Sequence, residues 1–312
     1  MTAPRHLVVR HLFVTVVGLS ITPALASAQQ PATPPVRPDT PLWLRPPGQV
    51  PELPEAGGES GGESRGERRR EDEIEPDRDS FTPALTTAGR GRLITESAYS
   101  FIDNRGVKET HSFPEMVLRY GVTDRVELRL GWNYEVGGAP SDITSVSQSG
   151  GTAEGAGLER GSLISYGVKV AITEQRNWLP TSVLIVLGAT PTSGEASDTQ
   201  LLATYAWGWE LPNRWKFDAA FRYSTGSDRE DHFDVFAPSA VLKVPVGEKW
   251  GVHAEYFGLF SRDKEQDFVK HYISPGVHYL VTPNLEVNVR VGWGLNDQSA
   301  RFFSNAGIGW RF

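Results

Sequence analysis

The most regular feature of the chain is an alternation of apolar and polar residues that recurs after about residue 92. In one stretch, Val126 and Leu128 alternate with Glu127 and Arg129. Because successive side chains of a strand point to opposite faces, this period predicts strands with one apolar and one polar face. The expected strands are residues 92–103, 108–120, 125–136, 161–173, 180–190, 199–211, 215–225, 232–246, 250–261, 267–281, 285–294 and 302–312.

The connections between these strands are of two kinds that alternate along the chain. One kind is short and rich in turn-forming residues, as at 121–124, 211–214, 246–249 and 281–284. The other kind is generally longer and more polar, and its longest example is 137–160. An even number of antiparallel strands with this asymmetry is typical of outer-membrane barrels. The prediction is an all-β fold: a twelve-stranded antiparallel transmembrane β-barrel preceded by a disordered N-terminal segment.

Aromatic residues are expected near both rims of this barrel, as in the girdles that meet the two headgroup layers of a membrane. The predicted girdle residues are Trp132, Tyr134, Trp209, Trp215, Trp250, Trp293 and Trp310. A soluble β-sandwich has the same alternation with the apolar face inside, so the alternation alone leaves that fold open. The chain ends on Phe312, which resembles the C-terminal aromatic residue read by the barrel-assembly machinery.

If the apolar face meets lipid, the polar face lines a lumen. The predicted lining is Glu115, Arg119, Glu127, Arg129, Glu135, Lys169, Asp218, Arg222, Lys243, His253, Glu255, Glu286, Arg290 and Arg311. Acids and bases are nearly balanced in this set, which predicts weak charge selectivity in a narrow pore or ligand cavity. The alternative is an internal network of ion pairs that fills the barrel. Glu115, Arg119, Glu127 and Arg129 lie on neighbouring strands and are expected to pair across the turn between them.

The N-terminal third of the chain has a different character. Residues 1–28 have the basic start, apolar core and A-x-A site of a Sec signal peptide. Residues 29–84 have nine prolines between Pro31 and Pro54 and then a mixed-charge run, which predicts a disordered periplasmic segment because too little apolar surface is available for a core. A solvated tail is the favoured interpretation of this segment; a spacer, a tether or a plug are the alternatives. The barrel is expected over residues 85–312.

Composition narrows the classes of function. The chain has 312 residues, 38 acidic against 31 basic side chains, and no cysteine. Its net charge of −7 argues against a nucleic-acid binder, and the absence of cysteine excludes disulfides and thiolate chemistry. His253, Glu255 and Ser261 share one strand face, but Ser261 is too far along it for a catalytic set, and His271 and His278 lack the partners and spacing of a metal site. We expect no catalytic residue, cofactor or metal.

Three segments carry a resemblance to a known family: residues 113–129, 179–194 and 274–286. The first is the most specific and contains Arg119-Tyr120-Gly121-Val122-Thr123-Asp124. Together they are similar to the outer-membrane transporters named after the meta pathway of phenol degradation, and the likeness covers residues 85–312. The resemblance implies passage of small molecules, aromatic ones among them, across the outer membrane.

The predicted function is passive passage or binding of small, hydrophobic or aromatic solutes by a monomeric barrel in the outer membrane, reached by the Sec route. The expected partners are outer-membrane lipid, the barrel-assembly machinery during insertion and a small-molecule solute. An outer-membrane hydrolase and a non-conducting structural or sensor barrel remain as alternatives.

Overall fold

The computed structural model describes residues 73–139, 143, 159–193, 198–228 and 231–312, all within one compact unit that spans residues 61–312. The predicted signal peptide and most of the proline-rich segment lie outside the described residues. Among the described residues, no helix is long and apolar enough to cross a membrane.

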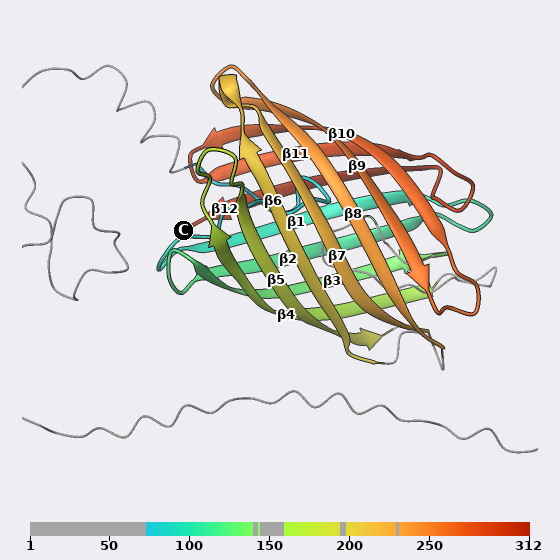
Figure 1. Ribbon diagram of the computed structural model, residues 1–312. Coiled ribbons are helices and arrows are strands. Elements are labelled where there is room, and N and C mark those ends of the chain that lie inside the picture. Colours follow the sequence, from blue (N-terminus) through green and yellow to red (C-terminus); the bar gives the residue numbers. More distant parts are fainter. Residues whose placement is uncertain (1–72, 140–142, 144–158, 194–197, 229–230) are drawn as a thin grey trace, which may run out of the picture. The chain divides into compact units, whose positions relative to one another are not determined.

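The described residues form a closed barrel of twelve antiparallel strands (Figure 1). Each strand pairs with its neighbours in the sequence, and β1 pairs with β12 to close the barrel. The strands are β1 Leu93–Asp103, β2 Thr110–Gly121, β3 Val126–Gly137, β4 Glu159–Thr173, β5 Thr181–Ser193, β6 Gln200–Glu210, β7 Lys216–Asp228, β8 Asp231–Val246, β9 Trp250–Arg262, β10 Val269–Thr282, β11 Leu285–Gly294 and β12 Phe302–Arg311.

The predicted fold class is confirmed, and every predicted strand has its counterpart within three residues at either end. The differences reach three residues at the ends of β5 and β7. Because β7 extends to Asp228 and β8 begins at Asp231, only residues 229–230 connect these two strands. The sequence predicts a longer loop here because Ser227 and Asp228 are polar. Backbone pairing does not depend on that polarity, and Ser227 lies opposite His232 in the register.

Connections leave the barrel at two rims. The start of β1, the end of β12 and the turns 122–125, 174–180, 211–215, 247–249 and 283–284 lie at one end, which we call the short-turn rim. The turn 211–215 contains a single 3-10 turn, η2 Pro212–Arg214. The other end, the long-loop rim, carries the connections 104–109, 138–158, 194–199, 229–230, 263–268 and 295–301.

Side chains alternate between a buried inner face and an exposed outer face of the barrel. On β3, Leu128 and Leu130 are 48% and 49% exposed, whereas Glu127 and Arg129 are 0% and 7% exposed. Charged side chains therefore point inward and aliphatic ones outward, which is the reverse of a soluble sandwich. An outer face of this kind is stable only where hydrocarbon replaces water around it.

Leu130 lies near the middle of β3 on this outer face. We expect Leu130→Arg to lower the free energy of unfolding in lipid vesicles by about 2 to 4 kcal/mol, because the charge meets hydrocarbon. The matched control, Leu130→Met, keeps the position apolar and is expected to cost less than about 1.5 kcal/mol. Equal stability of the two variants in a denaturant titration would mean that this face does not meet lipid.

Candidate functional site

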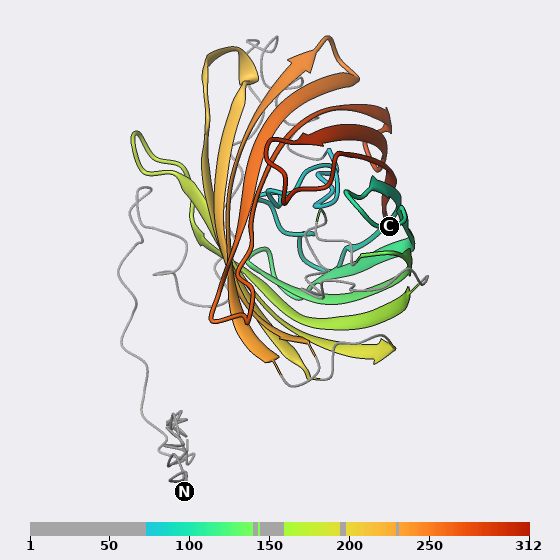
Figure 2. The same cartoon turned by 90° about the vertical axis from the view of Figure 1, so that its right-hand side faces the viewer.

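The lumen of the barrel is occupied by the chain's own residues 73–88, which we call the plug. In Figure 2 this first described part of the chain, drawn in blue, is enclosed by the strands. The plug contains no helix or strand, yet Asp77, Ser80 and Thr82 have no exposed surface. The expectation of a disordered periplasmic segment as far as residue 84 is therefore wrong for residues 73–84. The plug does not need an apolar core of its own, because the polar lumen supplies its partners.

Buried glutamates of the barrel wall hold the backbone of the plug. Glu96 on β1, Glu127 on β3 and Glu255 on β9 each accept hydrogen bonds from plug amides. The donors are Asp77 N (2.9 Å) and Arg78 N (3.1 Å) to Glu96 Oε2, Ala88 N (2.7 Å) to Glu127 Oε2, and Phe81 N (2.8 Å) and Thr82 N (2.7 Å) to Glu255. An irregular segment leaves its amides without partners of their own, and charge-assisted bonds of this kind satisfy them.

Asp77 is the centre of a buried charge network that joins the plug to four strands. The network consists of Asp77 with Glu96 on β1, Arg119 on β2, Glu127 and Arg129 on β3, and Lys169 on β4. Lys169 Nζ lies 3.1 Å from Asp77 Oδ1, and Arg129 also pairs with Asp77. Arg119 donates to Glu127 at 2.9 Å and to Glu96 at 2.8 Å. Three carboxylates thus face three cations, which offsets the cost of removing each charge from water.

The electrostatic environment of Asp77 fixes its charge. Burial by itself raises the pKa of Asp77, but Arg119, Lys169 and Arg129 outweigh that effect and hold the pKa well below its usual range. The carboxylate therefore stays ionised at every pH at which the lumen cations are charged.

Further ion pairs connect the plug to other sides of the barrel. Arg78 Nη1 lies 3.1 Å from Glu115 Oε2 on β2, and Lys243 Nζ on β8 lies 3.0 Å from Asp79 Oδ2. Glu75 pairs with Lys216 on β7 at the short-turn rim. The pairing predicted across the β2–β3 turn occurs between Arg119 and Glu127, whereas Glu115 takes its partner from the plug.

The residues predicted to line the lumen all carry little exposed surface. The exception to full burial is Lys243, whose side chain is 14% exposed. The buried residues are Glu115, Arg119, Glu127, Arg129, Glu135, Lys169, Asp218, Arg222, His253, Glu255, Glu286, Arg290 and Arg311. Arg311 lies at the short-turn rim, where its guanidinium donates to Asn284 Oδ1 at 2.7 Å. That these residues form the lining of a solute path stays a prediction.

The predicted girdle residues lie mostly on the exposed outer face. The exposed members are Trp132, Trp215, Trp250, Trp293 and Trp310, and Tyr134 and Trp209 are partly buried. Phe312 is exposed and its ring stacks on Trp310 with centroids 4.7 Å apart. Their roles at the membrane interface and in assembly stay predictions.

An apolar cluster lies in the half of the lumen toward the long-loop rim. Phe257 on β9, Tyr272 on β10 and Phe303 on β12 form an aromatic cluster with ring centroids 4.9 to 6.0 Å apart. Phe81 of the plug stacks on Phe257, with centroids 4.3 Å apart and planes 5° from parallel. The guanidinium carbon of Arg222 on β7 lies 4.2 Å from the Phe81 centroid, a cation–π geometry.

Ile143, from the connection between β3 and β4, narrows the lumen further. Its side chain is fully buried among the same apolar residues, and its carbonyl accepts a hydrogen bond from Arg290 Nη2 at 2.7 Å. The plug and Ile143 therefore both occupy the lumen between the two rims.

Two cavities lie near the two rims. One of about 620 Å³ lies between the plug and β5–β7, with Glu75, Thr86, Lys216 and Asp218 in its wall. The other, of about 250 Å³, lies on the side of the long-loop rim against residues 198–200. Both are large enough for water and a small solute.

From the sequence, a plug is predicted only as an alternative to a solvated tail, and Glu96 is not included in the predicted lining. Asp77, Arg78 and Asp79 continue a charged, proline-rich run, and nothing local to them indicates a partner. Glu96 lies in a strand whose two faces are both rich in small or polar residues, so its inward direction is not evident. The one available signal was Phe81, an aromatic residue in an otherwise polar segment next to β1.

The alternative catalytic set is separated by the fold. Glu255 is engaged by the plug amides, and Ser261 lies further along β9, roughly 26 Å from His253 by the rise of a strand. Ser261 Oγ instead donates to Asp267 at 3.1 Å. His271 Nδ1 is bonded to the Tyr256 hydroxyl at 2.7 Å, away from any such set.

The prediction that His278 lacks the partners of a metal site is wrong. Its ring lies inside the barrel beside His253 and the plug residue Asp79, and one ligand-type atom from each lies within 4.8 Å of the others. No local sequence pattern indicates this cluster, because the register of β9 and β10 and the path of the plug bring the three residues together.

Replacing Arg119, the central cation of the charge network, tests how much the network contributes to the stability of the folded barrel. We expect Arg119→Ala to lower the free energy of unfolding by about 3 to 5 kcal/mol, because Glu96 and Glu127 then stay buried without it. The control is Arg125→Ala, whose ion pair with Glu174 at 3.5 Å is more than half exposed. It is expected to cost less than about 1 kcal/mol. Equal losses in a denaturant titration would contradict this account.

Comparison with known proteins identifies the family of the chain and solved structures with a similar fold. It matches the family described as "Putative MetA-pathway of phenol degradation" over residues 77–312, so the match begins within the plug. Its fold is similar to that of the COG4313 outer membrane channel from Pseudomonas putida F1, with 12% identity over 77% of this chain and 100% of that one and a TM-score of 0.54.

Two porins are more distant. The NanC porin has 10% identity over 70% of this chain and 98% of its own, with a TM-score of 0.47. The KdgM porin has 8% identity over 70% of this chain and 99% of its own, with a TM-score of 0.42. No curated protein matches the sequence. The chain belongs to the family named after the MetA pathway of phenol degradation, as a membrane-spanning barrel of twelve strands.

Proposed function

We propose that the protein is a passive outer-membrane channel for small aromatic solutes, and that the plug is its closed gate. The observation that carries this proposal is the position of Phe81. Its ring occupies a site made of Phe257, Tyr272, Phe303 and Arg222, which is the kind of site that would hold an aromatic solute.

The width of the barrel supports passage. Barrels of eight strands are filled by their own side chains, and barrels of sixteen strands leave an aqueous channel. With twelve strands, the lumen has room for an additional chain segment, and the plug takes that room. A solute can therefore pass only when the plug is displaced, wholly or in part.

The plug is held mainly by groups that water can replace. Its anchors are ion pairs and hydrogen bonds to Glu96, Glu127 and Glu255, and its only stacked ring is Phe81. Once the plug moves, the same charges remain in a wet lumen, where they need no protein partner. A solute that takes the place of Phe81 removes its stacking contact, so the solute itself favours the open state.

The alternatives receive less support. A hydrolase needs a nucleophile beside a base, and His253 and Ser261 are far apart. A non-conducting structural or sensor barrel does not explain an aromatic site in the lumen, and the comparison with the COG4313 outer membrane channel favours a channel fold.

Planar-bilayer recordings of three forms of the protein test the gate: the full chain, a variant lacking residues 29–72 and a variant lacking residues 29–88. The first two keep the plug and are expected to be mostly closed. The third lacks it and is expected to show long-lived discrete conductance steps, because among the described residues the lumen then holds wall side chains and Ile143 alone. Closed behaviour of all three forms would overturn the channel proposal and favour a structural or sensor barrel.

A pair of matched anions tests the solute class in vesicles that contain the variant without residues 29–88. Benzoate and cyclohexanecarboxylate have similar size and charge, but only benzoate can stack on Phe257 and receive the Arg222 cation on its face. We expect benzoate to enter about 3 to 10 times faster, as the strength of stacking and cation–π contacts suggests.

The controls use the same vesicles. Phe257→Leu removes the stacking surface and is expected to bring the two rates together, whereas Phe221→Leu, on the exposed outer face of β7, is expected to leave the ratio unchanged. Equal rates in the unsubstituted barrel would reject the aromatic preference and leave the channel itself intact.

A further inference from the structure

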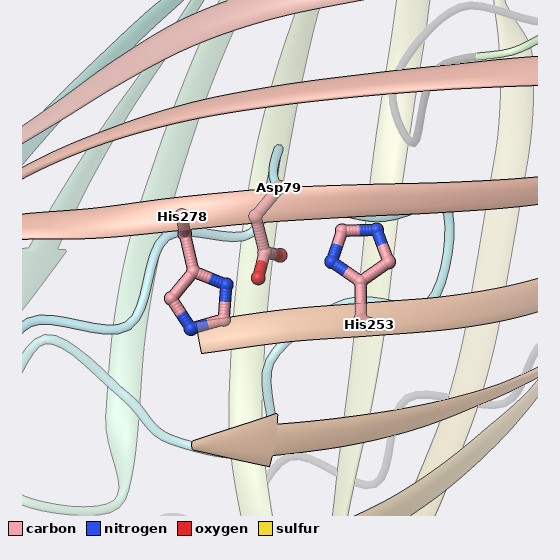
Figure 3. Close-up of side chains that lie close together, drawn as sticks. All are labelled: Asp79, His253 and His278. Atoms are coloured by element: carbon pink, nitrogen blue, oxygen red, sulfur yellow. The ribbon is translucent and has the colours of Figure 1, made fainter. Parts of the chain in front are cut away.

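We propose that Asp79, His253 and His278 bind a divalent transition-metal ion that fastens the plug to the barrel wall. The three residues come from the plug, β9 and β10. In Figure 3 the carboxylate of Asp79 lies between the two imidazole rings. The proposal concerns a binding site that is separate from the aromatic cluster, and it does not require that the barrel conducts.

The spacing of the three groups suits one ion. Their ligand-type atoms lie within 4.8 Å of one another. Bonds of about 2.0 to 2.2 Å from zinc to imidazole nitrogen and carboxylate oxygen place two ligand atoms up to about 4 Å apart. Changes of side-chain torsion that move each group by about 1 Å therefore complete the site, with a fourth position left for water or a solute atom.

Three of the four imidazole nitrogens have no hydrogen-bond partner among the described residues. His253 is 4% exposed, and within the described chain neither of its ring nitrogens has a hydrogen bond. Nδ1 of His278 is also buried and has none among the described residues. Buried polar atoms are nearly always satisfied in native proteins, so two such rings that face a carboxylate indicate a missing ligand.

The backbone makes room for both rings. His253 lies opposite Gly276 and His278 lies opposite Gly251 in the β9–β10 register. A Cβ atom at Gly251 would lie 1.9 Å from His278 Nε2, and one at Gly276 would lie 2.2 Å from His253 Cε1. Each imidazole therefore lies over the glycine of the neighbouring strand, and any larger residue there would displace it.

Charged groups from the plug and from β7, β8 and β11 surround the cluster, and each interacts electrostatically with Asp79 or His278. The acids besides Asp79 are Glu75, Asp218 and Glu286, and the bases are Lys216 and Lys243. Arg290 also interacts with Asp79, but it is paired with Glu255 at 3.5 Å. With all four carboxyl groups ionised, their charge equals that of the two ammonium groups and one divalent cation.

The existing partners of Asp79 are compatible with an ion. Lys243 Nζ contacts Oδ2 at 3.0 Å and the Ser80 hydroxyl donates to Oδ1 at 3.0 Å. A carboxylate has about four acceptor positions, so two remain for a metal. Donors of this kind orient a metal-bound carboxylate and are a regular part of such sites. Imidazole and carboxylate ligands favour Zn²⁺, Ni²⁺ and Co²⁺ over Ca²⁺ and Mg²⁺.

Metal binding is measured on the untagged full-length protein with Zn²⁺ in equilibrium dialysis and with Co²⁺ by visible absorption. We expect one equivalent bound. His253→Ala and His278→Ala are each expected to weaken binding by more than about 100-fold, beyond the effect known for residues that only orient a ligand. His271→Ala on the same strand as His278 is the control and is expected to change nothing. Equal affinity in all four proteins would overturn the site.

Each variant must first be shown to form a folded barrel, by β-type circular dichroism and resistance to protease. Asp79→Asn keeps the shape of the plug residue and is a second test of the site, since an amide is a weaker ligand than a carboxylate. Unchanged metal affinity in Asp79→Asn would show that the plug supplies no ligand, and it would overturn the proposal that the ion fastens the plug.

A separate experiment measures whether the bound ion keeps the plug in its place in the lumen. The chain has no cysteine, so Ala84→Cys introduces a single thiol at a plug position that is 2% exposed. Labelling of this thiol by a maleimide reports how often the plug leaves its place. We expect Zn²⁺ to slow labelling at least tenfold, and to have no effect when His278→Ala is added. Labelling that Zn²⁺ does not slow in the protein with the intact site would overturn the fastening.

Discussion

The structure depends on the pairing of charges inside a barrel whose outside is apolar. Asp77 of the plug faces Arg119, Arg129 and Lys169, and without it these strands would place an excess of positive charge in a closed space. Because the cost of a buried charge is large unless it is paired, the plug and the wall stabilise each other while the plug fills the lumen. The same pairing fixes the path of a segment that has no secondary structure of its own.

The lumen is divided by chemistry along its length. The charge network lies toward the short-turn rim, and the aromatic cluster of Phe257, Tyr272 and Phe303 lies toward the long-loop rim. The plug has the matching order, with Asp77 among the charges and Phe81 among the rings. A single segment therefore matches both halves, which is why it is ordered although its sequence resembles that of a solvated tail.

The barrel itself could be predicted from the sequence because its determinants are local. Val126, Leu128 and Leu130 alternate with charged residues over a few positions, and the turns carry their own Gly, Pro and Asn residues. The site could not be predicted, because its contacts join distant parts of the chain. Phe81 meets Glu255, and Asp79 meets His278, only after the strands have taken their register. Polar residues inside a lumen look the same in sequence as polar residues in water.

The plug continues directly into β1 through residues 89–92, where Gly91 N donates to Gly121 O at 2.7 Å. A displaced plug is therefore never lost to the surroundings. A short connection of this kind keeps a released segment at an effective concentration on the order of millimolar at its own docking place. Return is then an intramolecular event whose rate does not depend on how many copies of the protein the membrane holds. In the proposed gate, closing therefore needs no other molecule, because each barrel carries its own plug.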